Sequence, residues 1–141
     1  MSENYPEAAK RHLEDSKVLL DAERWDDSAY LAGYVVECSI KACITNPAPP
    51  SGIHVREIGH NNHELAARLA LMASSKKAGF RRSVSGVQIH GISKMLLNGF
   101  PWKETLRYEP SGYITSAEAK EWWNLANRVF SGLAKDLCVG D

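Results

Sequence analysis

Two groups of polar residues in this sequence could do chemistry. Glu37 and Lys41 lie four residues apart with the glutamate first, the favourable order for an ion pair on one helix face. His54, His60 and His63 carry imidazoles that could bind a metal, but intervals of six and three residues without a nearby cysteine match no common zinc pattern. We therefore expect a helix ion pair and no bound metal.

The pair of Glu37 and Lys41 has two interpretations. Tyr30 and Tyr34 precede it on the same helix face, so a buried polar pair could fix the helix register, with a tyrosine hydroxyl donating to it. On an exposed surface the pair would contribute only about 0.5 kcal/mol. The functional interpretation is that both side chains contact a ligand.

Charge and motifs exclude several classes of function. Lysine plus arginine and aspartate plus glutamate each number 17, so the formal net charge is zero and any nucleic-acid site must be local. The sequence contains no glycine-rich phosphate loop, dinucleotide fingerprint or nucleophile elbow. We interpret the densest basic patch as a solvated loop between two helices; it comprises Lys76, Lys77, Arg81 and Arg82.

The length of 141 residues suits one domain, which we expect to span residues 1–141 with an ordered core over about 5–138. Cys38, Cys43 and Cys138 are an odd set without metal-type spacing, and their apolar surroundings predict buried thiols. The sequence has neither a signal-type leader nor an apolar run long enough to cross a bilayer. A cytoplasmic location and no membrane contact are therefore expected.

Two helices are predicted in the N-terminal part. Apolar residues at three- and four-residue steps predict a helix over 7–23, with Pro6 in its first turn. A second helix is predicted from about residue 29 to 44, capped by Asp26, Asp27 or Ser28, and it has apolar residues on more than one face. The proline-rich segment after Asn46 ends it.

Three further helices are predicted in the C-terminal part. A short one covers about 63–73, and another covers about 82–97, where β-branched residues and glycines leave a strand as the alternative. Thr115 and Glu118 form a capping-box pattern that opens a last helix running to about Leu137. These elements predict an all-α, up-and-down bundle of four long helices plus a short helix.

Several segments of the sequence resemble the HEPN family. The segments 9–20, 25–29 and 31–42 are similar to the first two helices of HEPN domains, and the most specific part is the helix that carries Glu37 and Lys41. His63-Glu64-Leu65 resembles the His-x-Leu step of the family, and Arg107-Tyr108 resembles an element before its last helix. The resemblance extends from about residue 5 to 137.

The resemblance implies a helical bundle that usually dimerises and a function linked to nucleotides or RNA. Many HEPN members are metal-independent ribonucleases of toxin–antitoxin, CRISPR or antiviral systems, whereas others pair with nucleotidyltransferases or are inactive. The fold alone does not decide between these possibilities.

Catalytic HEPN members carry an arginine, then four to six intervening residues, then a histidine. Arg56 and His63 match this spacing, with His60 between them as a further ligand-binding candidate. Arginine can bind a phosphate through two parallel hydrogen bonds, and histidine can transfer a proton near neutral pH. The alternative role for His63 is to hold its loop against the bundle. Arg107 and Tyr108 could supply a cation and a stacking ring, although Tyr108 could equally pack against Trp102.

Two functional hypotheses remain. The first is a nucleotide- or RNA-binding domain, acting as a metal-independent endoribonuclease of a toxin–antitoxin or defence system, with an antitoxin as its partner. The second is a non-catalytic module for dimerisation or partner binding, working beside a nucleotidyltransferase. Under both hypotheses we expect a homodimer, because the second helix has apolar residues on many faces and the last helix carries adjacent tryptophans. Neither hypothesis requires a cofactor.

Overall fold

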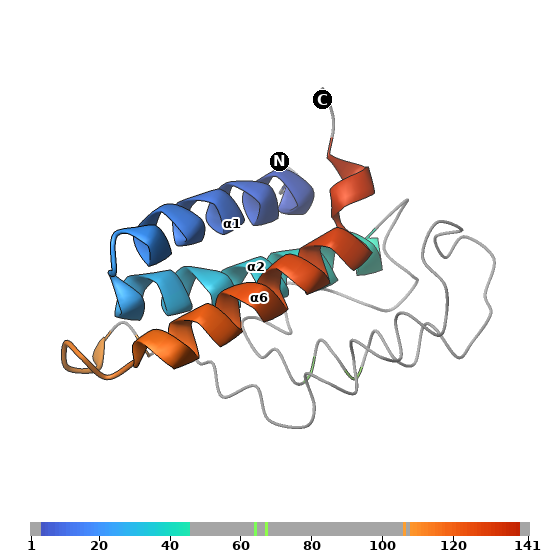
Figure 1. The fold of residues 1–141 in the computed structure, drawn as a ribbon. Coiled ribbons are helices and arrows are strands. Elements are labelled where there is room, and N and C mark those ends of the chain that lie inside the picture. The colour runs from blue at the N-terminus through green and yellow to red at the C-terminus, as the bar shows by residue number, and fades with distance from the viewer. Residues whose placement is uncertain (1–3, 46–63, 65–66, 68–105, 107, 139–141) are drawn as a thin grey trace.

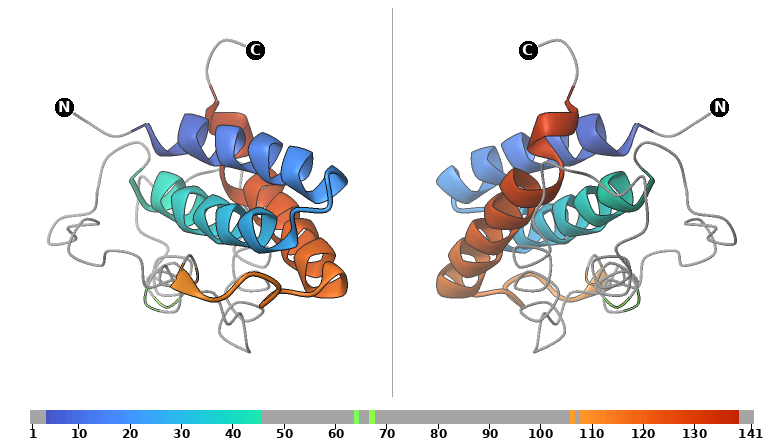
Figure 2. Two further views of the ribbon diagram at one scale, coloured as in Figure 1. Left: turned by 90° about the vertical axis from the view of Figure 1, so that its left-hand side faces the viewer. Right: turned by 90° about the vertical axis from the view of Figure 1, so that its right-hand side faces the viewer.

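The computed structural model describes residues 4–45, 64, 67, 106 and 108–138. Its elements are α1 (Tyr5–Asp21), α2 (Trp25–Thr45), α6 (Ser116–Leu133) and the 3-10 turn η2 (Lys135–Leu137). Figure 1 shows α1 antiparallel to α2, and α6 running in the same general direction as α2. The views in Figure 2 show that α6 crosses the other two helices at an angle.

Helix α1 begins and ends with local hydrogen bonds that the sequence supplies. Asn4 Oδ1 accepts from the backbone N–H of Glu7 at 3.2 Å, and Pro6 lies in the first turn. At the other end, the N–H groups of Glu23 and Arg24 donate to the carbonyls of Leu20 and Leu19. This is a Schellman arrangement, and Glu23 adopts the positive φ of 62° that such an ending requires. The predicted helix over 7–23 is thus confirmed, with its start and its end each two residues earlier.

Helix α2 begins at Trp25, about one turn before the predicted start. Arg24 takes the capping position, where its carbonyl accepts the N–H of Ser28, and residues 26–28 already have helical geometry. Their predicted role as caps is therefore wrong. Asp26 bonds instead to the chain before α6, and Ser28 is fully buried against α1.

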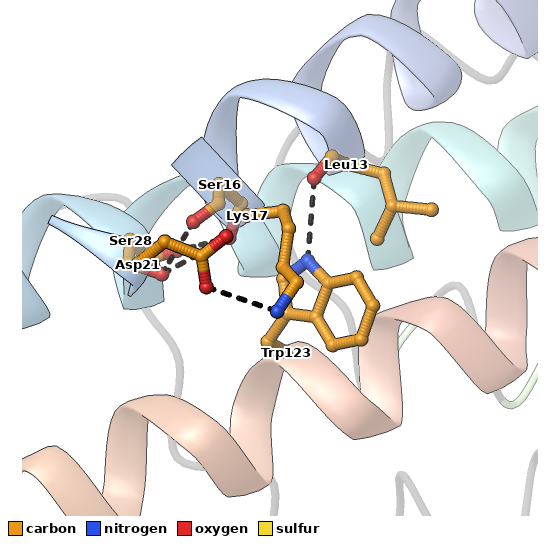
Figure 3. A network of polar contacts seen from close by, with 6 residues as sticks. All are labelled: Leu13, Ser16, Lys17, Asp21, Ser28 and Trp123. Carbon is orange, nitrogen blue, oxygen red and sulfur yellow. Dashed lines mark hydrogen bonds and ion pairs between the residues drawn. The ribbon is translucent and has the colours of Figure 1, made fainter. Parts of the chain in front are cut away.

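Two serines join α1 to α2 at close range. The hydroxyl of Ser16 donates to the carbonyl of Ser28 at 2.7 Å, and the hydroxyl of Ser28 donates to the carbonyl of Ser16 at 2.8 Å. Figure 3 shows this pair beside Trp123 of α6. Because serines are small, the two backbones approach closely while both buried hydroxyls stay hydrogen-bonded.

Helix α6 is strongly amphipathic, and its apolar face packs on α1 and α2. The predicted capping box is confirmed, because Thr115 Oγ1 accepts from the N–H of Glu118 and Glu118 Oε1 accepts from the N–H of Thr115. Trp123 Nε1 donates to the carbonyl of Leu13 at 3.2 Å, as Figure 3 shows. The helix ends at Leu133 rather than at about Leu137, because the chain tightens into η2.

The core lies where these three helices meet, and every residue from 35 to 44 of α2 is buried. The described residues form helices and turns without a strand, which confirms the all-α class for this part of the chain. Glu64 and Ala67 are helical, as the predicted helix over 63–73 requires. The rest of that helix, the basic patch and the predicted helix over 82–97 lie outside the described residues.

The cysteine prediction is confirmed for Cys38 and Cys43, which are buried free thiols. Cys138 is only partly buried, and its Sγ–H donates to the carbonyl of Pro6 at 3.6 Å. This contact brings the chain just after η2 back to the start of α1.

Candidate functional site

One face of α2 presents polar side chains at helical spacing. Positions 30, 34, 37 and 41 follow one another at steps of four, three and four residues, which places them in one row. Because α1 runs antiparallel, its early residues lie beside the second half of α2. We call the resulting row along the two helices the polar ladder; it consists of Tyr5 and His12 of α1 with Tyr30, Tyr34, Glu37 and Lys41 of α2.

The ion pair at one end of the polar ladder is buried. Lys41 Nζ lies 3.2 Å from Glu37 Oε2, and the two side chains are only 7% and 5% exposed. The same ammonium lies 5.7 Å from the centre of the Tyr5 ring, where an aromatic face attracts a cation. The prediction of a buried polar pair is confirmed, and the exposed-pair alternative is wrong.

Tyrosines and a histidine form the other part of the polar ladder. The Tyr30 hydroxyl donates to the Tyr34 hydroxyl at 3.1 Å, and the two rings meet edge to face. The His12 ring lies 5.9 Å from the Tyr34 ring, centre to centre. Both tyrosines and His12 are partly exposed, so solvent reaches this end.

The surroundings of His12 lower its pKa below 6.5. Burial is the largest cause because it disfavours the charged imidazolium, and the nearby Arg11 guanidinium acts in the same direction. The carboxylates of Asp15 and Glu37 oppose this change without cancelling it. His12 is therefore a neutral imidazole at pH 7, with one ring nitrogen able to donate and the other able to accept.

A second group of residues lies where the chain approaches α6. Asp26 Oδ2 accepts from the N–H of Gly112, and Asp26 Oδ1 accepts from the N–H of Ile114, each at 2.8 Å. The segment held in this way begins with Tyr108, which is 74% exposed. Most of the Tyr108 ring thus faces solvent, where a base could stack on it.

A pocket of about 420 Å³ adjoins this segment. Trp25 and Tyr30 supply aromatic rings to its lining, and Arg24 supplies one guanidinium. Among the described residues of the lining, four carboxylates outnumber this cation; they come from Glu23, Asp26, Asp27 and Glu109. This part of the lining is negatively charged, and negative charge disfavours a phosphate group directly against it.

The structure places the candidates for the site in separate regions. Glu37 and Lys41 lie in the second half of α2, whereas Tyr108 belongs to the segment attached to its first turn. From Asp26 to Glu37 the helix rises by about 16 Å, so the ion pair and this attachment do not form one cleft. Arg56, His60, His63 and Arg107 lie outside the described residues, and so does Trp102, the alternative partner of Tyr108.

Sequence reasoning missed two residues of these groups. His12 was not recognised, although its distance of seven residues from Tyr5 is a signal for a shared helix face. Asp26 was interpreted as a local cap, and nothing in the neighbouring sequence indicates that its partners are residues 112 and 114.

The described residues bring together no group of three histidine, cysteine, aspartate or glutamate side chains that could hold a metal. Across the same part of the chain, none of the helices is both long and apolar enough to cross a membrane.

A family model described as the HEPN domain matches residues 2–136. The chain belongs to the HEPN family. The resemblance seen in the sequence is thereby confirmed, and at the level of the family the chain is a nucleotide- or RNA-related helical domain. Searches of curated proteins and of solved structures gave no match to this HEPN domain.

Proposed function

We propose that this HEPN domain acts on RNA as a metal-independent endoribonuclease of a toxin–antitoxin or defence system. The observation that carries the proposal is the match to the HEPN family over residues 2–136, which includes every residue that we assign to the site. The proposal includes one cytoplasmic domain over residues 1–141, folded as four long helices plus a short one. It also includes a homodimer and an antitoxin partner.

Arg56 and His63 carry the chemistry in this proposal. The Arg56 guanidinium binds the scissile phosphate through two hydrogen bonds and stabilises the negative charge that develops on it. His63 takes the proton from the attacking 2′-hydroxyl or gives one to the leaving oxygen. A 2′-hydroxyl nucleophile restricts the enzyme to RNA and removes the need for a metal.

His60, Arg107 and Tyr108 hold the RNA in this proposal. The exposure of Tyr108 supports its role as a stacking ring, since a ring buried against its neighbours could not accept a base. Glu37 and Lys41 are buried and paired, which favours indirect action through the polar ladder over direct contact with a ligand.

The first experiment is cleavage of an end-labelled, mixed-sequence RNA by the purified protein in EDTA. We expect cleavage by the wild type, and its loss in both Arg56→Ala and His63→Ala. The matched controls are Arg11→Ala, which removes an exposed arginine on α1, and His54→Ala, which removes a histidine close in sequence. Both controls should cleave at the wild-type rate. Cleavage that survives in Arg56→Ala and His63→Ala would place the active site elsewhere.

The second candidate is a non-catalytic module that dimerises or binds a partner beside a nucleotidyltransferase. The burial of the Glu37–Lys41 pair favours it, because an ion pair covered on all sides acts in the fold rather than on substrate. The two candidates differ in cells. A ribonuclease toxin should stop growth when expressed alone and lose this effect in His63→Ala, whereas a partner-binding module should leave growth unchanged in both forms.

A further inference from the structure

The segment before α6 is attached to the start of α2 by one carboxylate. Both oxygens of Asp26 accept backbone N–H groups, from Gly112 and from Ile114, at 2.8 Å each. A charged acceptor makes such bonds stronger than those between neutral groups. A side chain in the first turn of α2 therefore holds a segment that follows more than 80 residues later in the chain.

The shape of the segment comes from its own turns. Residues 108–113 are all exposed, and inside the segment the N–H of Glu109 donates to Leu106 and the N–H of Tyr113 donates to Pro110. Gly112 has a φ of +88°, which glycine adopts without strain. A Cβ at this position would meet nothing within 4 Å, so the conformation and not the space favours glycine there.

Tyr108 lies at the beginning of the same segment with most of its ring in solvent. The turn that contains Tyr108 is closed by the hydrogen bond from the N–H of Glu109 to the carbonyl of Leu106. The following turn is closed by the hydrogen bond from the N–H of Tyr113 to the carbonyl of Pro110. Since these bonds are internal to the segment, they set its shape but not its place on the bundle. Its place on the bundle comes from the core packing of Leu106 and Ile114 together with the Asp26 carboxylate, which bonds the segment to α2.

We propose that Asp26 is a positioning residue that holds Tyr108 where its ring stacks on a base of RNA. This inference rests on the proposed function, because it presumes that Tyr108 contacts RNA. In this proposal Asp26 acts through the segment and not on RNA, since each of its carboxylate oxygens already accepts a backbone N–H, from Gly112 and from Ile114.

The first test measures RNA binding. The probe is a short, mixed-sequence, fluorescently labelled RNA with 2′-O-methyl groups, which cannot be cleaved by attack of a 2′-hydroxyl. We expect Tyr108→Ala to weaken binding about tenfold, in the range for one lost base stack, and Asp26→Ala to weaken it to a similar extent. Asp27→Ala is the matched control, because it removes the same charge from the same helical turn without breaking the attachment. It should bind RNA like the wild type.

A double-mutant cycle separates positioning from a general effect on the fold. If Asp26 acts through Tyr108, Asp26→Ala should cause no further loss of binding in a Tyr108→Ala background. Fully additive losses would overturn the inference. Should Asp26→Ala fold poorly, Asp26→Asn keeps one acceptor oxygen and allows the same cycle, with an intermediate loss expected.

Amide hydrogen exchange tests the attachment without RNA. The N–H groups of Gly112 and Ile114 should be protected in the wild type and in Asp27→Ala, and should exchange freely in Asp26→Ala. Binding that falls in Tyr108→Ala but not in Asp26→Ala would overturn the inference and leave the proposed function standing. A wild type that binds no RNA would overturn both, and the exchange data would then describe a purely structural attachment.

Discussion

Glu37 and Lys41 are two buried charges, and the free-energy cost of burying each one depends on the presence of the other. Removing either ion from water has a large desolvation penalty, which their mutual attraction offsets only while both are present. By contrast, Lys17 and Asp21 form an exposed pair at 3.0 Å with 48% and 63% of their side chains exposed. The two pairs have the same spacing on a helix, with the acid first in the buried pair and the lysine first in the exposed one, and they differ most in burial.

We predict that Lys41→Met lowers the free energy of unfolding by about 3–5 kcal/mol, because it leaves the Glu37 carboxylate buried without its cation. The double variant Glu37→Leu/Lys41→Met should recover most of this loss. Lys17→Met is the matched control and should change the free energy by less than about 1 kcal/mol. Urea denaturation of the four proteins measures these differences, and equal effects of Lys41→Met and Lys17→Met would contradict the prediction.

His12 gives the stability a dependence on pH. Its pKa is lowered in the folded protein, so the unfolded chain binds the proton more readily. Stability should therefore be highest above pH 6.5 and decrease as the pH falls from 6.5 through the lowered pKa. Because the other four histidines also titrate, the prediction concerns the difference between wild type and His12→Asn.

Urea midpoints for both proteins, taken across this pH range, provide the measurement. The wild type should lose more stability than His12→Asn as the pH falls, because the variant lacks the imidazole whose pKa is lowered. A difference between the two that stays constant with pH would show that His12 titrates normally in the fold.

At the scale of elements, the turn between α1 and α2 contains one strained residue. Glu23 has a φ of 62°, a region in which a Cβ is unfavourable and glycine is not. We predict that Glu23→Gly raises the free energy of unfolding by about 0.5–1 kcal/mol, since relief of strain exceeds the entropic cost of glycine. Glu23→Ala, which also removes the carboxylate but keeps the Cβ, should give no gain. Thermal or urea denaturation of the wild type and the two variants measures these free energies of unfolding, and a gain in Glu23→Ala equal to that in Glu23→Gly would contradict the prediction.

The helices could be predicted where their signals are local. The caps of α6 lie within four residues of one another, and the apolar period of α1 is regular, so both helices were located from sequence. The start of α2 was placed too late, because residues 26–28 look like caps in isolation. The partners of Asp26 are Gly112 and Ile114, and the partner of Ser28 is Ser16, all of which only the fold brings near.

In the candidate site, too, local patterns could be recognised from sequence, whereas contacts between distant segments could not. Glu37 and Lys41 could be recognised from an interval of four residues on one helix. The positions of His12 beside Tyr34 and of Asp26 beside Gly112 depend on how helices pack, which no local spacing encodes. The catalytic assignment of Arg56 and His63 stays a prediction, since both lie outside the described residues.

At the scale of the whole molecule, the reason given for a dimer does not hold. Helix α2 was expected to leave apolar faces for a partner, but residues 35–44 are already buried within one chain. Trp122 of α6 is buried as well. A dimer would have to use other surfaces, and the described residues with large exposed apolar or aromatic side chains are Val18, Tyr108 and Tyr113.

Family membership still leads us to predict a homodimer in solution. Sedimentation equilibrium should give twice the 15.6 kDa of one chain at the concentrations used for RNA cleavage. If the active site is shared between two copies, the cleavage rate per chain should also fall on dilution below the dissociation constant. A single-chain mass at every accessible concentration would refute the dimer.

The contact between Cys138 and the carbonyl of Pro6 means that the described chain nearly closes on itself. In Figure 1 the start of α1 and the turn η2 lie at the same end of the helical bundle. A fold with adjacent ends can be circularly permuted, because a short linker between them spans little distance. The exposed turn at residues 21–24 offers a place for new termini. Such a permuted chain would begin with α2 and end with α1, so the serine-linked helix pair would form from the two ends of the chain rather than from neighbouring segments.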